Sequence, residues 1–99
     1  MIINSVQEND KIIFALEGRL DTITAPKLQS ALIPAFDEAK EVLLDFAKLA
    51  YVSSAGLRVL LIGQKTAKAK GASMMITGVS EEIMEVFDMT GFTDMLTIV

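Results

Sequence analysis

Short apolar runs typical of strands alternate along this chain with segments whose apolar residues fall at helical spacing. This alternation restricts the chain to folds in which strands and helices follow one another. The strand-like runs cover 2–7, 11–17, 41–46, 73–77 and 95–99, and the helical segments follow residue 24, span 54–70 and lie between 80 and 91. The order ββαβαβαβ predicts a single α/β domain over 1–99, with a mixed sheet covered by helices, because parallel neighbouring strands need crossover helices.

Several residues predict where these elements begin and end. Residues 8–10 have turn chemistry, so the first two strands are expected to pair as a hairpin. Thr24 and Ser80 are candidate N-caps of the first and third helices, and Gly71 is the expected left-handed residue after the second. Pro34 lies deep in the first helix, where it lacks a backbone N–H and clashes with the preceding turn. We expect the helix to be kinked or split just before that proline.

Two adjacent serines, Ser53 and Ser54, lie where an apolar strand gives way to a helix, within the segment from Tyr51 to Leu57. Either serine is a natural N-cap. The first turn of a helix offers backbone N–H groups without intrahelical partners and the positive end of the helix dipole, which suit a phosphate or another anion. Serine at a helix start is commonly only a cap, so the junction by itself leaves a purely structural role open.

The residue inventory argues against a self-contained enzyme. The chain contains neither cysteine nor histidine, which excludes a disulfide framework, thiol chemistry, a His/Cys metal site and a Ser-His-Asp triad. No glycine-rich phosphate motif is present, so we expect no cofactor and no metal. Asp21 and Asp45 are the remaining candidates for paired carboxylates. Solvation at a turn and at a strand end explains this pair more simply.

Charge and hydropathy limit the partners. The formal net charge of −4 opposes binding to a nucleic acid backbone, which needs a clustered basic surface. No apolar stretch reaches membrane-spanning length and no signal peptide is evident, so the sequence predicts a cytoplasmic protein. The mean hydropathy of +0.46 is high for so small a domain. We therefore expect part of its apolar surface to meet a partner.

Charged residues recur on single faces of two predicted helices. Arg58 and Lys65 lie seven residues apart on the second helix, and Glu81, Glu85 and Asp88 follow helical spacing on the third. Solvated faces explain both patterns, with partner electrostatics as the alternative.

The run from Asp45 to Leu57 resembles the signature of the STAS family, specifically the bacterial anti-sigma-factor antagonists. In those proteins the segment after the central strand commonly reads aromatic, apolar, Asp, Ser, Ser or Thr, Gly, Leu. Three further stretches agree with the family in the right order, namely 18–21 with 24–26, Gly71 before a strand, and 87–92. The resemblance covers nearly the whole chain and implies the STAS fold.

The resemblance also implies a function. In the family, the first serine of the signature is phosphorylated by a partner kinase, and by position that serine is Ser54. Ser53 stands where the family often has Asp. The unmodified protein would bind an anti-sigma factor that doubles as a serine kinase and so free a sigma factor, and a serine phosphatase would reset it. The candidate partner-binding residues are Asp21, Ser53, Ser54, Ala55, Gly56 and Arg58.

Two other functions remain open at this stage. The chain could be a STAS scaffold module in a signalling assembly, where the serine loop binds a partner without being modified. It could also bind a small anion or a nucleotide at the helix N-terminus that follows Ser53.

Overall fold

A computed structural model describes residues 1–99. Its elements are β1 (Ile2–Glu8), β2 (Lys11–Leu20), α1 (Ala25–Glu38), β3 (Glu41–Val52), α2 (Ser54–Lys70), β4 (Ser73–Thr77), α3 (Glu81–Thr90) and the 3₁₀ turn η1 (Phe92–Asp94). The four strands form one sheet in the order β1-β2-β3-β4, in which β1 and β2 are an antiparallel hairpin and the other pairs are parallel. The predicted mixed sheet with crossover helices is confirmed.

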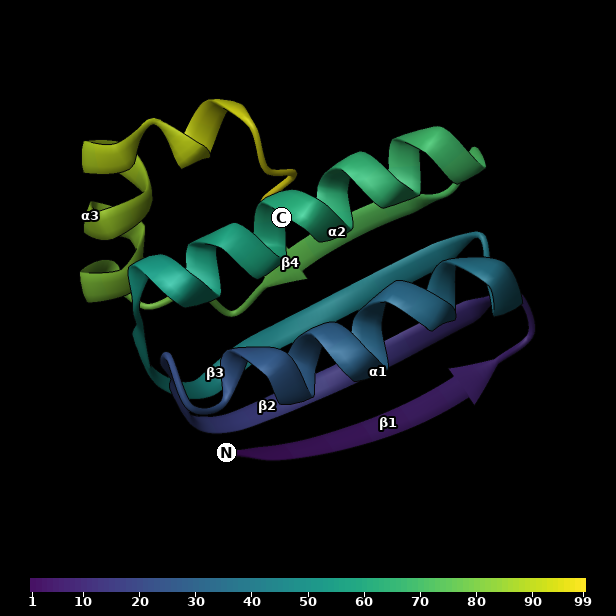
Figure 1. The fold of residues 1–99 in the computed structure, drawn as a ribbon, viewed down its shortest axis with the longest axis horizontal. Helices are drawn as coiled ribbons and strands as arrows, with labels where there is room; N and C mark the ends of the chain where they lie inside the picture. Colours follow the sequence, from purple (N-terminus) through teal and green to yellow (C-terminus); the bar gives the residue numbers. More distant parts are fainter.

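The helices define which face of the sheet is buried. α1 and α2 lie side by side in front of the strands, and α3 lies beyond one end of α2 (Figure 1). The buried side chains of β2 and β3, such as Phe14 and Leu44, point into the core beneath these helices. Phe46 carries the same core to α3, where its ring centroid lies 6.5 Å from that of Phe87. None of the helices has both the length and the apolar character needed to cross a membrane.

The expected strand at 95–99 is wrong. Only Ile98 pairs with β4, in an isolated parallel bridge to Ile76. The reason is the 3₁₀ turn η1 just before this segment. The N–H groups of Met95 and Leu96 both donate to the carbonyl of Phe92, which holds the chain in that turn. Residues that a longer strand would need are therefore part of this turn. The order of elements along the chain is ββαβαβα, followed by one isolated bridge.

The expectation that the first helix is split at the proline is also wrong, since α1 is one continuous helix through Pro34. Leu28 and Leu32 before the proline and Phe36 after it are all buried in one core, so packing supports the helix on both sides of the proline. The carbonyl that loses its partner belongs to Ser30, an exposed residue, where water can replace the missing N–H.

The other predicted helix ends are mostly confirmed. Gly71 has φ +69° and ends α2, and the Ser80 hydroxyl accepts a hydrogen bond of 3.2 Å from the Ile83 N–H at the start of α3. Thr24 occupies the N-cap position of α1, but its side chain makes no capping bond. Its hydroxyl donates instead to the carbonyl of Arg19 at 2.8 Å.

Replacing Gly71 with alanine should destabilise the domain by about 1 kcal/mol, the cost of holding a Cβ in a left-handed conformation. No atom lies within 4 Å of the added Cβ, so the effect isolates the backbone. Equilibrium urea unfolding measures it. Gly71→Asn is the matched control, because asparagine tolerates this conformation and should lose less. Equal stability of all three proteins would contradict the argument.

Candidate partner-binding site

The candidate site lies at the carboxyl ends of the parallel strands β2 and β3. Their last residues, Leu20 and Val52, are paired in register. Directly after β3, the N–H of Ser53 donates to the carbonyl of Leu20 at 2.8 Å. This bond brings the start of α2 against the end of β2, so loops that are distant in sequence meet at one edge of the sheet.

The two serines have different roles. Ser53 is the N-cap, since its backbone is extended and its hydroxyl accepts a hydrogen bond of 3.3 Å from the N–H of Gly56. Its carbonyl accepts the N–H of Leu57 at 2.9 Å. Ser54 is the first helical residue and is exposed. The geometry therefore separates a capping hydroxyl on Ser53 from an exposed serine at position 54.

Gly56 allows α2 to approach β2 closely. A Cβ at this position would lie 2.7 Å from Cγ of Leu20 and 3.1 Å from its carbonyl oxygen. The missing side chain is thus a steric requirement for the contact between the helix N-terminus and the strand end. This explains in physical terms why a glycine follows the two serines.

Asp21 organises the loop between β2 and α1. Its carboxylate accepts the N–H groups of Thr24 and Ile23, each at 3.0 Å. The bond from the Thr24 N–H, supported by the Thr24 hydroxyl, the Ile23 N–H and the Arg19 charge, lowers the pKa of Asp21 below its usual value. The ionised form of Asp21 therefore holds the backbone of this loop in place through these two hydrogen bonds. The same loop holds Ile23 out in solvent, where it is 87% exposed.

Sequence reasoning missed two exposed apolar residues near the carboxyl ends of these strands, Ile23 and Tyr51. Tyr51 is 40% exposed, and the guanidinium of Arg19 lies 4.2 Å from the centre of its ring. Nε of the same arginine lies 3.9 Å from Oδ2 of Asp21. An aromatic residue next to the end of a strand and an isoleucine between two threonines were the available signals. Neither fits a buried periodic position.

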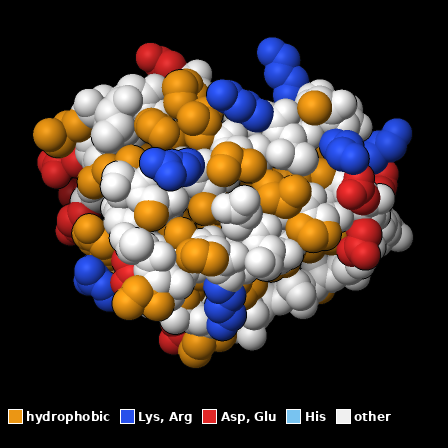
Figure 2. All heavy atoms as spheres, in the orientation of Figure 1, with side chains coloured by type: hydrophobic (Ala, Val, Ile, Leu, Met, Phe, Trp, Pro, Cys, Tyr) orange, Lys and Arg blue, Asp and Glu red, His pale blue; other side chains and the backbone are white.

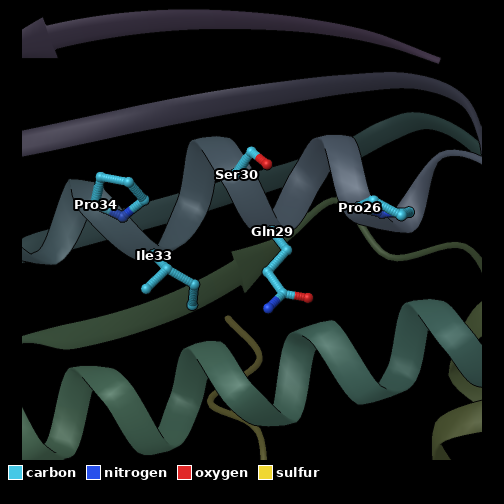
Figure 3. Close-up of a pocket in the computed structure, with 5 residues that line it drawn as sticks. All are labelled: Pro26, Gln29, Ser30, Ile33 and Pro34. Carbon is cyan, nitrogen blue, oxygen red and sulfur yellow. The ribbon is translucent and has the colours of Figure 1, made fainter.

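A shallow groove joins the N-terminal turns of α1 and α2. It encloses about 170 Å³ and is lined by Thr22, Ala25, Pro26, Gln29, Ala55, Arg58 and Val59. A more open depression of about 480 Å³ continues from Pro26 along α1 to Pro34. In Figure 3, Gln29 and Ile33 extend from α1 toward α2 along this depression. Two of the predicted binding residues, Ala55 and Arg58, therefore line a groove at the start of α2.

The helix-covered face is apolar and basic. Figure 2 shows hydrophobic and basic side chains across this face, with acidic side chains gathered toward its edges. The four charged residues of α2 are all basic, namely Arg58, Lys65, Lys68 and Lys70. Lys70 pairs with Asp37 of α1 at 2.8 Å. The acidic residues of α3 are exposed, as expected of a solvated face.

Asp21 and Asp45 do not form a pair of catalytic carboxylates. Asp45 pairs in register with Ala15, six residues before Asp21 on the chain. That separation corresponds to roughly 20 Å along a strand. Oδ1 of Asp45 instead accepts the N–H of Ala47 at 2.9 Å. The structure therefore supports the simpler role for both side chains.

Comparison with known proteins identifies the family. A family model described as the STAS domain matches residues 3–99. The chain belongs to the STAS domain family. The anti-sigma-B factor antagonist of Bacillus subtilis (strain 168) is 31% identical to this STAS domain over 91 residues, which cover 92% of this chain and 83% of that protein.

Solved structures confirm the fold of this STAS domain. An anti-sigma factor antagonist from Mycobacterium paratuberculosis has a TM-score of 0.86 at 15% identity, covering 98% of this chain and 83% of that one. The Bacillus cell fate determinant SpoIIAA in its phosphorylated form has a TM-score of 0.78 at 15% identity, covering 99% and 91%.

Replacing Gly56 with alanine should destabilise this STAS domain by about 1–3 kcal/mol, because the added methyl group overpacks the contact with Leu20. Thermal and urea unfolding measure the loss. Gly71→Ala provides a comparison in which the added methyl meets nothing. If Gly56→Ala left stability unchanged, the close approach would not be required.

Proposed function

We propose that this STAS domain is an anti-sigma factor antagonist whose partner binding is switched by phosphorylation of Ser54. The unmodified protein would bind an anti-sigma factor that is also a serine kinase and so release a sigma factor. A serine phosphatase would restore the unmodified state. The proposal draws its class of partner from the relative in Bacillus subtilis, which is named an anti-sigma-B factor antagonist.

The observation that carries the proposal is the position of Ser54. It is exposed at the first position of α2, directly after a capping serine. The N–H groups of the first turn that find partners are those of Gly56 and Leu57, and both donate to Ser53. The N–H groups of Ser54 and Ala55 are left at the positive end of the helix dipole, where a phosphate is favoured.

A phosphate on Ser54 would change the binding surface without requiring a change of fold. It adds about −1.5 to −2 charges and three acceptor oxygens. Arg58 lies four residues further along α2, so both side chains share one side of the helix. The phosphate would offset the charge that Arg58 presents to an acidic partner and would leave excess negative charge beside the groove. The fold of this chain is similar to both the unphosphorylated and the phosphorylated form of SpoIIAA.

The partner surface that fits best is acidic with an apolar centre. Arg58 and the apolar side chains of the groove would face it at the start of α2. Ile23 and Tyr51 add exposed apolar area near the ends of the strands. Apolar anchors with a charged rim are typical of protein interfaces.

Ser54→Ala should abolish phosphorylation by the cognate kinase and keep both the fold and partner binding. Ser53→Ala is the matched control and should retain most of the phosphorylation, with a modest loss of stability from the missing cap. Ser54→Asp should weaken binding, although a carboxylate has less charge and fewer acceptor oxygens than a phosphate. Phosphopeptide mapping and a binding assay measure these effects. Phosphate on Ser53 would reverse the assignment, and no phosphorylation by a verified kinase would favour the scaffold function.

Arg58→Glu should slow association with the anti-sigma factor by roughly tenfold at low salt, because electrostatic steering acts mainly on the association rate. Stopped-flow kinetics over a salt series measure the change. Lys68→Glu makes the same charge change on the same helix, more than two turns further from Ser54, and should have a much smaller effect. Equal effects of both variants would show that the partner responds to net charge alone.

A further inference from the structure

The face of the sheet opposite α1 and α2 carries a row of apolar side chains that lie outside the hydrophobic core. Val6, Ile13, Leu43 and Met75 are paired in register across β1, β2, β3 and β4. Val6 is 53% exposed, and the other three are partly buried without packing against the core cluster. Every helix that contacts the central strands packs on the other face, where Phe14 and Leu44 are buried. Figure 1 is viewed from that helix-covered side.

Charged residues of opposite sign flank this row on the two central strands. Toward one end of the strands, Lys11 of β2 is paired with Glu41 of β3. Toward the other end, Glu17 of β2 is paired with Lys48 of β3. Neither pair forms an ion pair within the chain, whose two salt bridges are Arg19–Asp21 and Lys70–Asp37.

The register between β2 and β3 shifts after the pair Ala15 and Asp45, as at a β-bulge. Lys48 still lies on this face. A depression of about 230 Å³ is lined by Asn4, Ala15 and Asp45, which share one row, together with Glu17 and Lys48. The uncovered face is thus an apolar row with a polar row beside it, bounded at each end by one acidic and one basic residue on the two central strands. At the first of these borders Glu8 of β1 lies beside Lys11 on the same face.

We propose that this uncovered sheet face binds a second copy of the chain, about a two-fold axis that runs parallel to the strands between β2 and β3. This axis places β2 of one protomer over β3 of its partner. Ile13 then faces Leu43, and Val6 faces Met75. Lys11 faces Glu41, Glu17 faces Lys48, and Glu8 faces the uncharged Ser73, so no like charges lie directly opposite each other at the two borders. A two-fold interface has to be complementary to itself, and this face meets that requirement.

The alternative two-fold axis, along the apolar row, is unfavourable. It would place Glu41 over Asp45 of the partner, so that two acidic side chains face each other. It would also place Lys11 over Ala15 of the partner, so that the lysine has no acidic residue opposite it. The arrangement parallel to the strands places Asp45 over Ala15, and Oδ1 of Asp45 keeps its hydrogen bond from the Ala47 N–H. Charge complementarity therefore selects both the occupant and the orientation.

The size of the face predicts a weak dimer. Four strands about 4.8 Å apart and seven residues rising about 3.3 Å each give a face on the order of 20 Å square. Such a face has an area of about 400 Å², about half of the roughly 800 Å² per partner that stable interfaces commonly bury. The dimer would leave Ser54 accessible, because that serine starts a helix on the other side of the sheet. The inference does not depend on the proposed function.

Sedimentation equilibrium of the full chain from about 10 µM to about 1 mM tests the proposal over the range expected for a weak interface. The apparent mass should rise with concentration from 10.7 kDa toward twice that value. Leu43→Asn should reduce the association at least tenfold. A mass of one chain throughout would overturn the proposal and leave the face free for a different partner.

Charge exchange makes the test specific. On the two central strands, Lys11→Glu leaves two acidic residues at this border, and Glu41→Lys leaves two basic residues, so each variant should remain monomeric by itself. A mixture of the two should recover a heterodimer, because the acidic border of one then faces the basic border of the other. Lys68→Glu and Glu85→Lys on the helices are the matched controls and should dimerise like the wild type.

Circular dichroism establishes that each variant is folded, and amide chemical shifts followed on dilution of the wild type locate the contact without any substitution. The shifts should change at Ile13 and Leu43 rather than along α1 and α2. Dimerisation by the single variants, failure of the mixture to associate, or dilution shifts confined to the helices would each overturn the proposal.

Discussion

The contact between the start of α2 and the end of β2 determines the shape of the candidate site. One backbone hydrogen bond, from the Ser53 N–H to the Leu20 carbonyl, and one missing side chain, at Gly56, bring the helix within van der Waals distance of the strand. The contact brings the N-terminal turn of α2 to the edge where β2 and β3 end. Ser53 caps α2 with its hydroxyl, so Ser54 is the first helical residue and is exposed.

The sheet separates two surfaces with different physical character. Helices cover one face, and their N-terminal turns present an exposed serine, a groove and basic charge. The other face has no helix over it and carries an apolar row between charges of alternating sign. A chain with high mean hydropathy has to place apolar side chains on its surface, and here some lie on that second face and near the ends of the strands, while others lie on α3 and the C-terminal segment. A modification of Ser54 and an association through the open face would therefore act on separate surfaces.

Local residue chemistry predicted most of the elements. Period-two and period-3.6 patterns located the strands and helices, and Gly71 and Ser80 marked helix ends that the structure confirms. The two errors share a cause. Local rules predict a break at Pro34 and a strand from Met95 to Val99, but burial of Leu28, Leu32 and Phe36 keeps α1 continuous, and a 3₁₀ turn shortens the last segment to one bridge. Tertiary packing and a competing turn outweighed propensity at both places.

The sequence by itself determined the family, the alternation of strands and helices, and the identity of Ser54 as the candidate hydroxyl, because these depend on residue types at short spacing. Only the tertiary structure decided that Ile23 and Tyr51 are exposed near the strand ends, that Asp21 and Asp45 lie far apart, and that Val6, Ile13, Leu43 and Met75 form one row. Those relations join residues on different strands and loops. They depend on strand register and on which face the helices cover, and no local pattern contains either.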